Sequence, residues 1–298
     1  MELSINAVPI DKKDFTWDLT LNLSGNRGTL GDFLPGVGLF YVTDVQIGGV
    51  KAASIPNGGH FLGLTGDYWL REKDTEGKEI AGGRYQVDPT TGLYKTSNVT
   101  TNIVGNREPS IIGGLNNNIR YKNLNVSFLI DMRLGGDIYN GTEYYTTVRG
   151  LSMRTLDRQS VTVDGVLSTT GEPVSYTYEA DKTYTVNGQS KSGKYMIQQY
   201  WNNYGSNSYN FITKTNWLRL RSLSLSYDFT DLFKKKNIVK GLSATFSANN
   251  LLVWTNYKGM DPEVSVSGSG TGGSGSMGID YNGIPATRNV TFGLNFTF

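Results

Sequence analysis

The stretch from Arg288 to Phe298, R-N-V-T-F-G-L-N-F-T-F, decides how the fold is interpreted. Side chains alternate between the two faces of a strand, so from Asn289 onward one face holds only Val, Phe and Leu and the other only Asn, Thr and Gly. The apolar face could cover a soluble core or contact lipid. A polar face without Lys or Glu suits a crowded, wet lumen, and the chain stops on an aromatic residue instead of a loose polar tail. The signal per barrel strand is weak, so this strand alone leaves both folds open.

The composition indicates a β-rich, turn-rich protein. Glycine (37 residues) and tyrosine (18 residues) are abundant, whereas only 18% of the residues are charged. The net charge of +2 favours neither nucleic acid nor an acidic surface as a partner. No apolar run approaches the ~20 residues of a membrane-spanning helix, but barrel strands hide their apolar residues at every second position. Because the chain has no cysteine, disulfides and thiolate metal sites are excluded.

Period-two alternation predicts about nine strands and no helix of ordinary length. Among the clearest is 15–24, where Phe, Trp and Leu alternate with Thr, Asp, Asn and Ser. In 217–229 the apolar residues switch from even to odd positions, which predicts a β-bulge near Ser222. The predicted strands are 3–7, 15–24, 39–47, 60–70, 110–119, 121–133, 217–229, 242–254 and 288–298.

The connections between these strands alternate between short and long. The long ones are expected at about 71–108, 134–215 and 255–287. Short turns on one side and long loops on the other are the anatomy of an outer-membrane barrel. Lipid permits no open sheet edge, and an odd number of strands cannot close as an antiparallel barrel by itself. The sequence therefore predicts an all-β fold, an antiparallel transmembrane β-barrel arc whose last strand pairs with a strand carried elsewhere.

Several motifs resemble those of one transporter family. Residues 216–227, N-W-L-R-L-R-S-L-S-L-S-Y, are similar to the Y-L-R-L-K-N-L-T-L-G-Y strand of SusC/RagA-type TonB-dependent transporters. Residues 248–263, A-N-N-L-L-V-W-T-N-Y-K-G-M-D-P-E, resemble that family's G-Q-N-L-F-T-F-T-K-Y-K-G-Y-D-P-E. Further likeness lies in G-G-D-I-Y-N at 135–140, in D-F-T-W at 14–17 and in the terminal strand. The motifs follow the family's order and touch the whole length of the chain.

The resemblance implies a Bacteroidota transporter of the cell outer membrane, a 22-strand barrel with an internal plug. Such proteins import glycans, peptides or other bulky nutrients together with a SusD-like lipoprotein. Residues 1–298 would be the C-terminal part, the last nine strands, because residues 1–8 show no secretory signal and the chain shows no TonB box and no plug. The implied partners are the remainder of the transporter, which a separate chain could carry, the lipoprotein, TonB through the missing N-terminal part, and outer-membrane lipid. No nucleic acid and no cofactor are expected.

Two groups of aromatic residues are candidate functional residues. One lies among Asn and Gln in the long connection and could stack on sugars or peptides, or could instead pack that loop on itself. The other is expected in the two aromatic girdles at the membrane interfaces. Arg219 and Arg221 lie near the loop-side end of their strand and could face the lumen or the lid. The substrate candidates are Tyr195, Tyr200, Trp201, Tyr204 and Tyr209, and the interface candidates are Trp17, Tyr227, Phe229, Trp254 and Phe298.

No catalytic or metal-binding constellation is visible, so the sequence predicts a protein that is not an enzyme. His60 is the only histidine, and the near match to G-x-S-x-G at 268–272 lacks a strand–turn–helix context. The acidic segment 74–79 lacks the spacing and the closing Glu of a calcium loop. The main alternative is a soluble carbohydrate-binding β-protein, which would fold in buffer without detergent. A self-sufficient small porin would need an even number of strands and a signal peptide.

Overall fold

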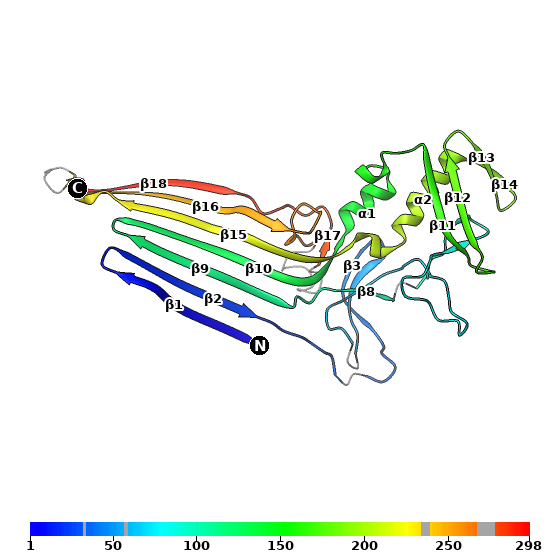
Figure 1. The fold of residues 1–298 in the computed structure, drawn as a ribbon, viewed down its shortest axis with the longest axis horizontal. Helices are drawn as coiled ribbons and strands as arrows, with labels where there is room; N and C mark the ends of the chain where they lie inside the picture. Colours follow the sequence, from blue (N-terminus) through cyan, green and yellow to red (C-terminus); the bar gives the residue numbers. More distant parts are fainter. Residues whose placement is uncertain (32–33, 57–58, 100, 234–238, 267–277) are drawn as a thin grey trace.

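The computed structural model describes residues 1–31, 34–56, 59–99, 101–233, 239–266 and 278–298, which form one long open sheet with a body of packed loops at one end (Figure 1). Seven long antiparallel strands make the sheet, with β1 and β18 at its edges in the described residues, and the two-residue β17 (Ile279–Asp280) pairs with the end of β10. In spatial order the strands are β1 (Glu2–Lys12), β2 (Phe15–Ser24), β9 (Ile111–Tyr121), β10 (Leu124–Asn140), β15 (Ile212–Asp228), β16 (Gly241–Thr255) and β18 (Asn289–Thr297). The predicted fold class, an antiparallel barrel arc, is confirmed.

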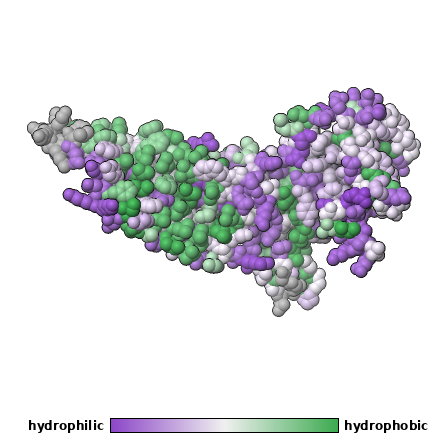
Figure 2. All heavy atoms as spheres, in the orientation of Figure 1, coloured by the Kyte–Doolittle hydropathy of each residue, from purple (hydrophilic) through white to green (hydrophobic). Residues whose placement is uncertain are grey.

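The register of the strands joins their apolar residues into one continuous face. A single row of directly opposed residues runs across β2, β9, β10, β15, β16 and β18, and the next row along the same strands is polar throughout. Figure 2 shows apolar side chains gathered over the strands and polar ones over much of the loop body. The apolar row is Trp17, Ile119, Val126, Leu225, Phe246 and Phe292, and the polar row is Asp18, Asn118, Ser127, Ser224, Ser247 and Thr291.

The connections are sorted by length to the two ends of the sheet. Residues 13–14, 122–123 and 229–240 join strands at one end, and the last of these includes the short helix α3 (Thr230–Phe233). The other three connections, 25–110, 141–211 and 256–288, lie at the opposite end and make the loop body (Figure 1). The alternation expected from the sequence is therefore present among the seven strands.

Two of the nine predicted barrel strands lie in the loop body instead. Residues 39–47 and 60–70 contain β3 (Phe40–Ile47) and the three-residue β5 (Gly63–Thr65), which pair with β4 (Val50–Ser54) and β8 (Ile103–Asn106) in a separate sheet. These strands are shorter than the ~9–11 residues that cross a bilayer. Their apolar residues cover a protein core, which requires the same alternation as a lipid face. The seven-strand sheet replaces the predicted nine.

The rest of the loop body contains a second small sheet, a hairpin and helices. The sequence predicted no helix of ordinary length, but α2 (Gly193–Gly205) has 13 residues, with Ser192 capping it through the backbone N–H of Tyr195. Its Tyr, Trp and Asn residues are mediocre helix formers, so tertiary packing outweighs propensity. No helix in the described part of the chain is long and apolar enough to cross a membrane. The other elements are β6 (Gln86–Asp88), β7 (Leu93–Tyr94), β11 (Ser160–Leu167), β12 (Pro173–Glu179), β13 (Thr183–Val186), β14 (Gln189–Ser192), α1 (Gly141–Val148), η1 (Met153–Thr155) and η2 (Ser208–Phe211).

Two hydrophobic cores hold this body together. The first lies next to the end of β10 and draws residues from all three long connections, so these connections pack as one unit. The second lies between α2 and the β11–β12 sheet. The first core includes Ile47, Val50, Leu64, Tyr139, Phe211 and Ile279, and the second includes Val87, Leu93, Val163, Tyr178, Met196 and Ile197.

Two irregularities shape the strands where they leave the sheet. The bulge predicted near Ser222 is confirmed, because the register of β15 shifts between Leu220 and Ser222 against both β10 and β16. Against β10 the extra residue is Arg221, and the bulge keeps the apolar residues on both sides of it on one face. In β10 the register shifts between Leu134 and Asp137, where both glycines of G-G-D-I-Y-N have positive φ angles of 80° and 84°.

Candidate functional site

The aromatic residues predicted for the membrane interfaces lie at two levels of the sheet. Trp17, Tyr227, Phe229 and Phe298 lie near the short-turn end, where the rings of Tyr227 and Phe229 are 4.4 Å apart between centroids. Trp254 lies near the loop end, opposite Leu218 on the apolar face. Two separated levels are what interfacial girdles require. Their contact with the membrane interface stays a prediction.

One polar residue interrupts the apolar face and is covered by Trp17. Asn117 lies between Leu19 and Phe128 in the register, and its Oδ1 accepts the indole N–H of Trp17 at 3.2 Å. Only 3% of Asn117 is exposed. The indole of Trp17 therefore satisfies the side-chain carbonyl of Asn117, whereas the buried Nδ2 of Asn117 has no hydrogen-bond partner among the described residues.

Replacing Trp17 by Phe should destabilise the sheet by about 1–3 kcal/mol, because the buried carbonyl of Asn117 loses its donor. The measurement is the denaturant dependence of unfolding of the protein refolded in lipid vesicles. Trp254→Phe is the matched control, since the exposed indole of Trp254 has no hydrogen bond to any described residue. Equal losses in the two variants would contradict a specific role for the Trp17–Asn117 bond.

A cluster of five charges fastens the connection 256–288 to the polar face of the sheet. Arg219 Nη2 lies 2.5 Å from Asp261 Oδ1, and Arg219 Nε lies 2.6 Å from Glu263 Oε2. Arg221 lies 2.6 Å from Asp131 Oδ2 and 2.7 Å from Glu263 Oε1, so Glu263 bridges both arginines. Both arginines therefore lie on the polar face of the sheet, and whether that face lines a lumen or meets a lid stays a prediction.

The carboxylate of Asp261 also organises the connection itself. Its oxygens accept the backbone N–H groups of Glu263 and Ala286, each at 3.0 Å. Asp261 and Arg219 are both almost fully buried. Burial of an ion pair costs desolvation energy, which good geometry and extra hydrogen bonds offset. The residues D-P-E at 261–263 thus hold two parts of the same connection against the barrel wall.

A hydrogen bond between Tyr257 and Asp280 also stabilises this connection. The Tyr257 hydroxyl donates to Asp280 Oδ2 at 2.6 Å, and both residues are buried. Burial raises the pKa of Asp280, and the nearby Asp261 carboxylate adds to the rise, whereas the hydrogen bond from Tyr257 acts in the opposite direction. The hydroxyl therefore stabilises the ionised form of Asp280.

Replacing Tyr257 by Phe should destabilise the loop body by about 1.5–3 kcal/mol at a pH where Asp280 is ionised. Without the hydroxyl, the pKa of Asp280 would rise further. As the pH falls, the carboxyl becomes protonated and no longer requires a hydrogen-bond donor, so the loss of stability should become smaller. Unfolding temperatures of detergent-extracted protein at about pH 8 and pH 4 measure this. A loss that does not depend on pH would contradict it.

The five aromatic residues predicted to bind substrate do not gather at one site. Tyr195, Tyr200, Trp201 and Tyr204 lie on α2, and Tyr209 lies in η2. The Trp201 ring is 5.1 Å from that of Tyr200 and 5.4 Å from that of Tyr204, and burial raises the pKa of Tyr200 to about 12. These three therefore help pack the loop on itself, which was the alternative. Tyr195 and Tyr209 are exposed. Substrate contact by any of the five stays a prediction.

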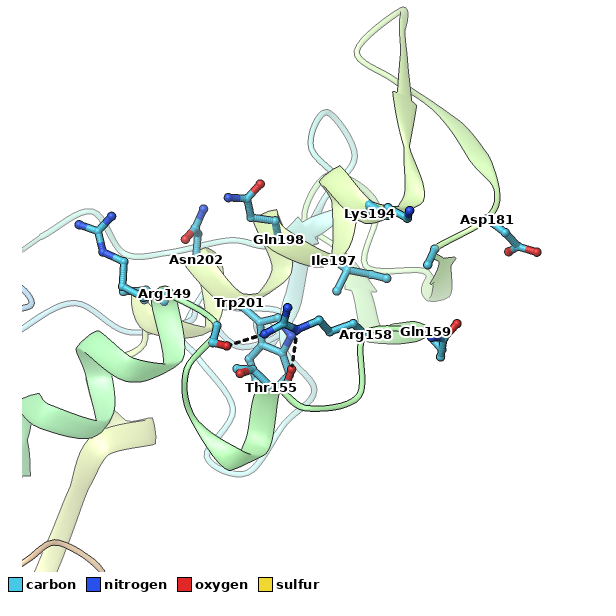
Figure 3. A pocket seen from close by; sticks show the side chains of 13 residues that line it. Arg149, Thr155, Arg158, Gln159, Asp181, Lys194, Ile197, Gln198, Trp201 and Asn202 are labelled. Atoms are coloured by element: carbon cyan, nitrogen blue, oxygen red, sulfur yellow. Dashed lines mark hydrogen bonds between the residues drawn. The ribbon is translucent and has the colours of Figure 1, made fainter.

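A groove of about 1020 Å³ lies in the loop body beside α2 (Figure 3). Of the five aromatic candidates only Trp201 lines it. The sequence could not indicate the other lining residues, because their proximity depends on a helix that the alternation did not reveal. The groove is lined by Val148, Arg149, Gly150, Thr155, Arg158, Gln159, Ala180, Asp181, Lys194, Ile197, Gln198, Trp201 and Asn202.

The described residues hold no group of three or more side chains arranged for a metal ion. In the acidic segment 74–79, Asp74 Oδ1 accepts the backbone N–H groups of Glu76 and Lys78 at 3.0 and 2.9 Å. The carboxylate of Asp74 thus stabilises its own turn. The near match to G-x-S-x-G at 268–272 lies outside the described residues.

The comparisons with known proteins agree with the resemblance found in the sequence. No family model matches the chain. TonB-dependent receptor P3 of Formosa agariphila is 26% identical over 310 residues, which cover 100% of this chain and 28% of the relative. TonB-dependent receptor SusC of Bacteroides thetaiotaomicron is 26% identical, with 100% of this chain and 26% of the relative covered. The homologues of this chain are therefore TonB-dependent receptors, SusC among them, as the sequence predicted.

Solved structures show the same fold. The structure of the RagAB peptide transporter matches with a TM-score of 0.60 at 16% identity and covers 100% of this chain and 29% of that one. The RagAB peptide importer in the "open-open" state matches with a TM-score of 0.57 at 16% identity, and 28% of that chain is covered. The chain spans less than a third of the length of each of these proteins, which fits an open arc.

Proposed function

We propose that this chain forms barrel wall and outer loops of a SusC-like TonB-dependent transporter that imports glycans, peptides or similar bulky nutrients across the cell outer membrane. The observation that carries the proposal is the continuous apolar face over seven strands whose short turns lie at one end and whose packed loops lie at the other. Lipid is the environment that such an exposed face requires. The homology to TonB-dependent receptors supports the same function.

In this role the two faces of the sheet have different tasks. The apolar face contacts lipid, and the polar face of Asn, Ser and Thr lines the lumen. The charge cluster around Arg219 keeps the connection 256–288 against the lumen wall. The edges β1 and β18 pair with strands of the remaining transporter, because lipid tolerates no open edge. That remainder supplies the plug and the contact with TonB, and a SusD-like lipoprotein covers the loop body.

A pull-down tests this assignment. Outer membranes are extracted in mild detergent, the chain is captured, and mass spectrometry identifies what accompanies it. We expect plug sequence and the missing strands, on the same polypeptide or on a companion, together with a lipoprotein. Recovery of the chain alone in the soluble fraction would overturn the proposal and favour the soluble carbohydrate-binding protein.

Protease treatment of intact cells tests the orientation. Barrels of this kind keep their short turns in the periplasm, so the loop body should lie outside. We expect cleavage within 25–110, 141–211 or 256–288, and protection of the turns at 13–14 and 122–123 until the cells are opened. Sparing of all three long connections would show that the orientation is wrong.

A further inference from the structure

The groove beside α2 has two walls of different origin (Figure 3). One wall is a stripe of α2, where Lys194, Gln198 and Asn202 follow one another at intervals of four residues and so share one side of the helix. The other wall is the segment 149–159 that leaves α1, with Arg149 and Arg158. All five side chains belong to exposed residues, so the groove is open to a ligand from outside.

Positive charge in this groove exceeds negative charge. Arg149, Arg158 and Lys194 line it, against the single carboxylate of Asp181. None of these three cations takes part in an ion pair between described residues. Other cations of the same body do have carboxylate partners within 4.0 Å, in the pairs Arg84–Glu72, Arg154–Glu143 and Lys182–Glu179.

The guanidinium of Arg158 is held in place by the main chain. Its Nη2 donates to the carbonyl oxygen of Gly150 at 2.7 Å, and its Nε donates to that of Thr155 at 3.4 Å. These contacts fix its direction without neutralising its charge. A planar guanidinium in a fixed position is suited to carboxylate and sulfate oxygens.

The remaining lining indicates what kind of anion fits. The side-chain amides of Gln159, Gln198 and Asn202 make no hydrogen bond to another described residue, so they can bind hydroxyl groups. Trp201 and the buried Ile197 provide an apolar floor. Amides beside an aromatic floor suit sugar rings. No strand lines the groove, whereas an extended peptide is commonly bound along a strand edge.

We propose that this groove binds an anionic oligosaccharide, one whose sugar rings carry carboxylate or sulfate groups. The proposal deepens the proposed function by naming a substrate class, and rests on it for its role in uptake. A volume of about 1020 Å³ is at the upper limit of typical ligand sites, which fits several sugar units better than a single ring. The cations bind the acidic groups, and the amides bind the hydroxyls between them.

Direct binding to the detergent-extracted protein with its companions tests the proposal. The probes are a hexamer of galacturonic acid, a sulfated galactose hexamer, the neutral galactose hexamer and hexaglutamate. We expect one or both of the acidic sugars to bind at least tenfold more tightly than the neutral one, and the difference to shrink at high salt. Comparing the two acidic sugars distinguishes carboxylate from sulfate. Equal binding of the neutral hexamer, or tighter binding of hexaglutamate, would overturn the proposal.

Matched variants assign the binding to this groove. Arg149→Gln and Lys194→Gln should each weaken binding of the acidic hexamer by about tenfold, since each removes a charge-assisted contact. Lys191→Gln is the control, because Lys191 lies over the ring of Tyr195 outside the groove. Unchanged binding in the Arg149→Gln, Lys194→Gln double variant would overturn the site. If the chain still occurs in the outer membrane with its plug and lipoprotein, that failure leaves the transporter assignment intact.

Discussion

Replacing Arg219 by Ala should release the connection 256–288 from the barrel wall, at a cost of about 3–5 kcal/mol. The side chains of Arg219 and Asp261 are only 3% and 5% exposed, so removing the guanidinium leaves a carboxylate buried without an opposite charge. Glu263 would lose one of its two arginine partners as well. An uncompensated buried charge is more damaging than the loss of a surface pair, and this difference decides the expected size of the effect.

Limited proteolysis of the detergent-extracted protein measures the release, as faster cleavage between β16 and β18. The control is Arg84→Ala, which breaks the exposed pair with Glu72 and should cost no more than about 1 kcal/mol. A second test replaces Asp261 by Asn, which keeps the shape but removes the charge that Arg219 neutralises. Resistance to protease in both Arg219→Ala and Asp261→Asn would show that the cluster does not hold the connection.

The sheet could be predicted from the sequence because its faces are chemically distinct over many residues. In β2 and β18 every second residue is apolar, and only an extended strand places those residues together. The same rule failed for 39–47 and 60–70. Alternation reports that one face of a strand is covered, but it does not report whether lipid or protein covers it. Only the structure separates the two cases, since the strand predicted at 60–70 contains a β5 of just three residues.

The helix α2 escaped prediction for a related reason. Its apolar anchors, Met196 and Ile197, are adjacent, and the remaining residues are mainly Tyr, Asn and Gln. Such a composition is equally typical of a polar loop. Helix formation here depends on the cap at Ser192 and on packing against β11 and β12, and neither is visible as a period in the sequence.

The candidate sites were predictable only in part, because they depend on contacts between distant segments. The bulge at Arg221 could be inferred from the switch in phase, and it places both arginines on the polar face. Their partners Asp261 and Glu263 follow about 40 residues later, across a connection whose path the sequence does not specify. The groove is similar, since Arg149 and Lys194 come together only once α1 and α2 have packed.

Replacing Phe292 by Lys should prevent stable insertion of the sheet, whereas Thr291→Lys on the adjacent position should be tolerated. Phe292 is 78% exposed on the apolar face, and its ring contacts that of Phe246 at 5.1 Å between centroids. A lysine at the middle of the bilayer costs about 2–4 kcal/mol on the lipid side of a barrel. Thr291 lies opposite Ser247 on the polar face, where water in the lumen would solvate the added amine.

The pair of variants separates the two faces, because both add the same charge at nearly the same height. The measurements are the fraction of chain recovered in the outer membrane and the unfolding free energy of protein refolded in lipid vesicles. Loss in both variants would indicate only that β18 tolerates no charge. Loss in Thr291→Lys alone would mean that the polar face, and not the apolar face, is the covered one. Loss in Phe292→Lys alone shows that the apolar face is the covered one, and recovery of the unmodified chain in the outer-membrane fraction then identifies lipid, not a protein core, as its cover.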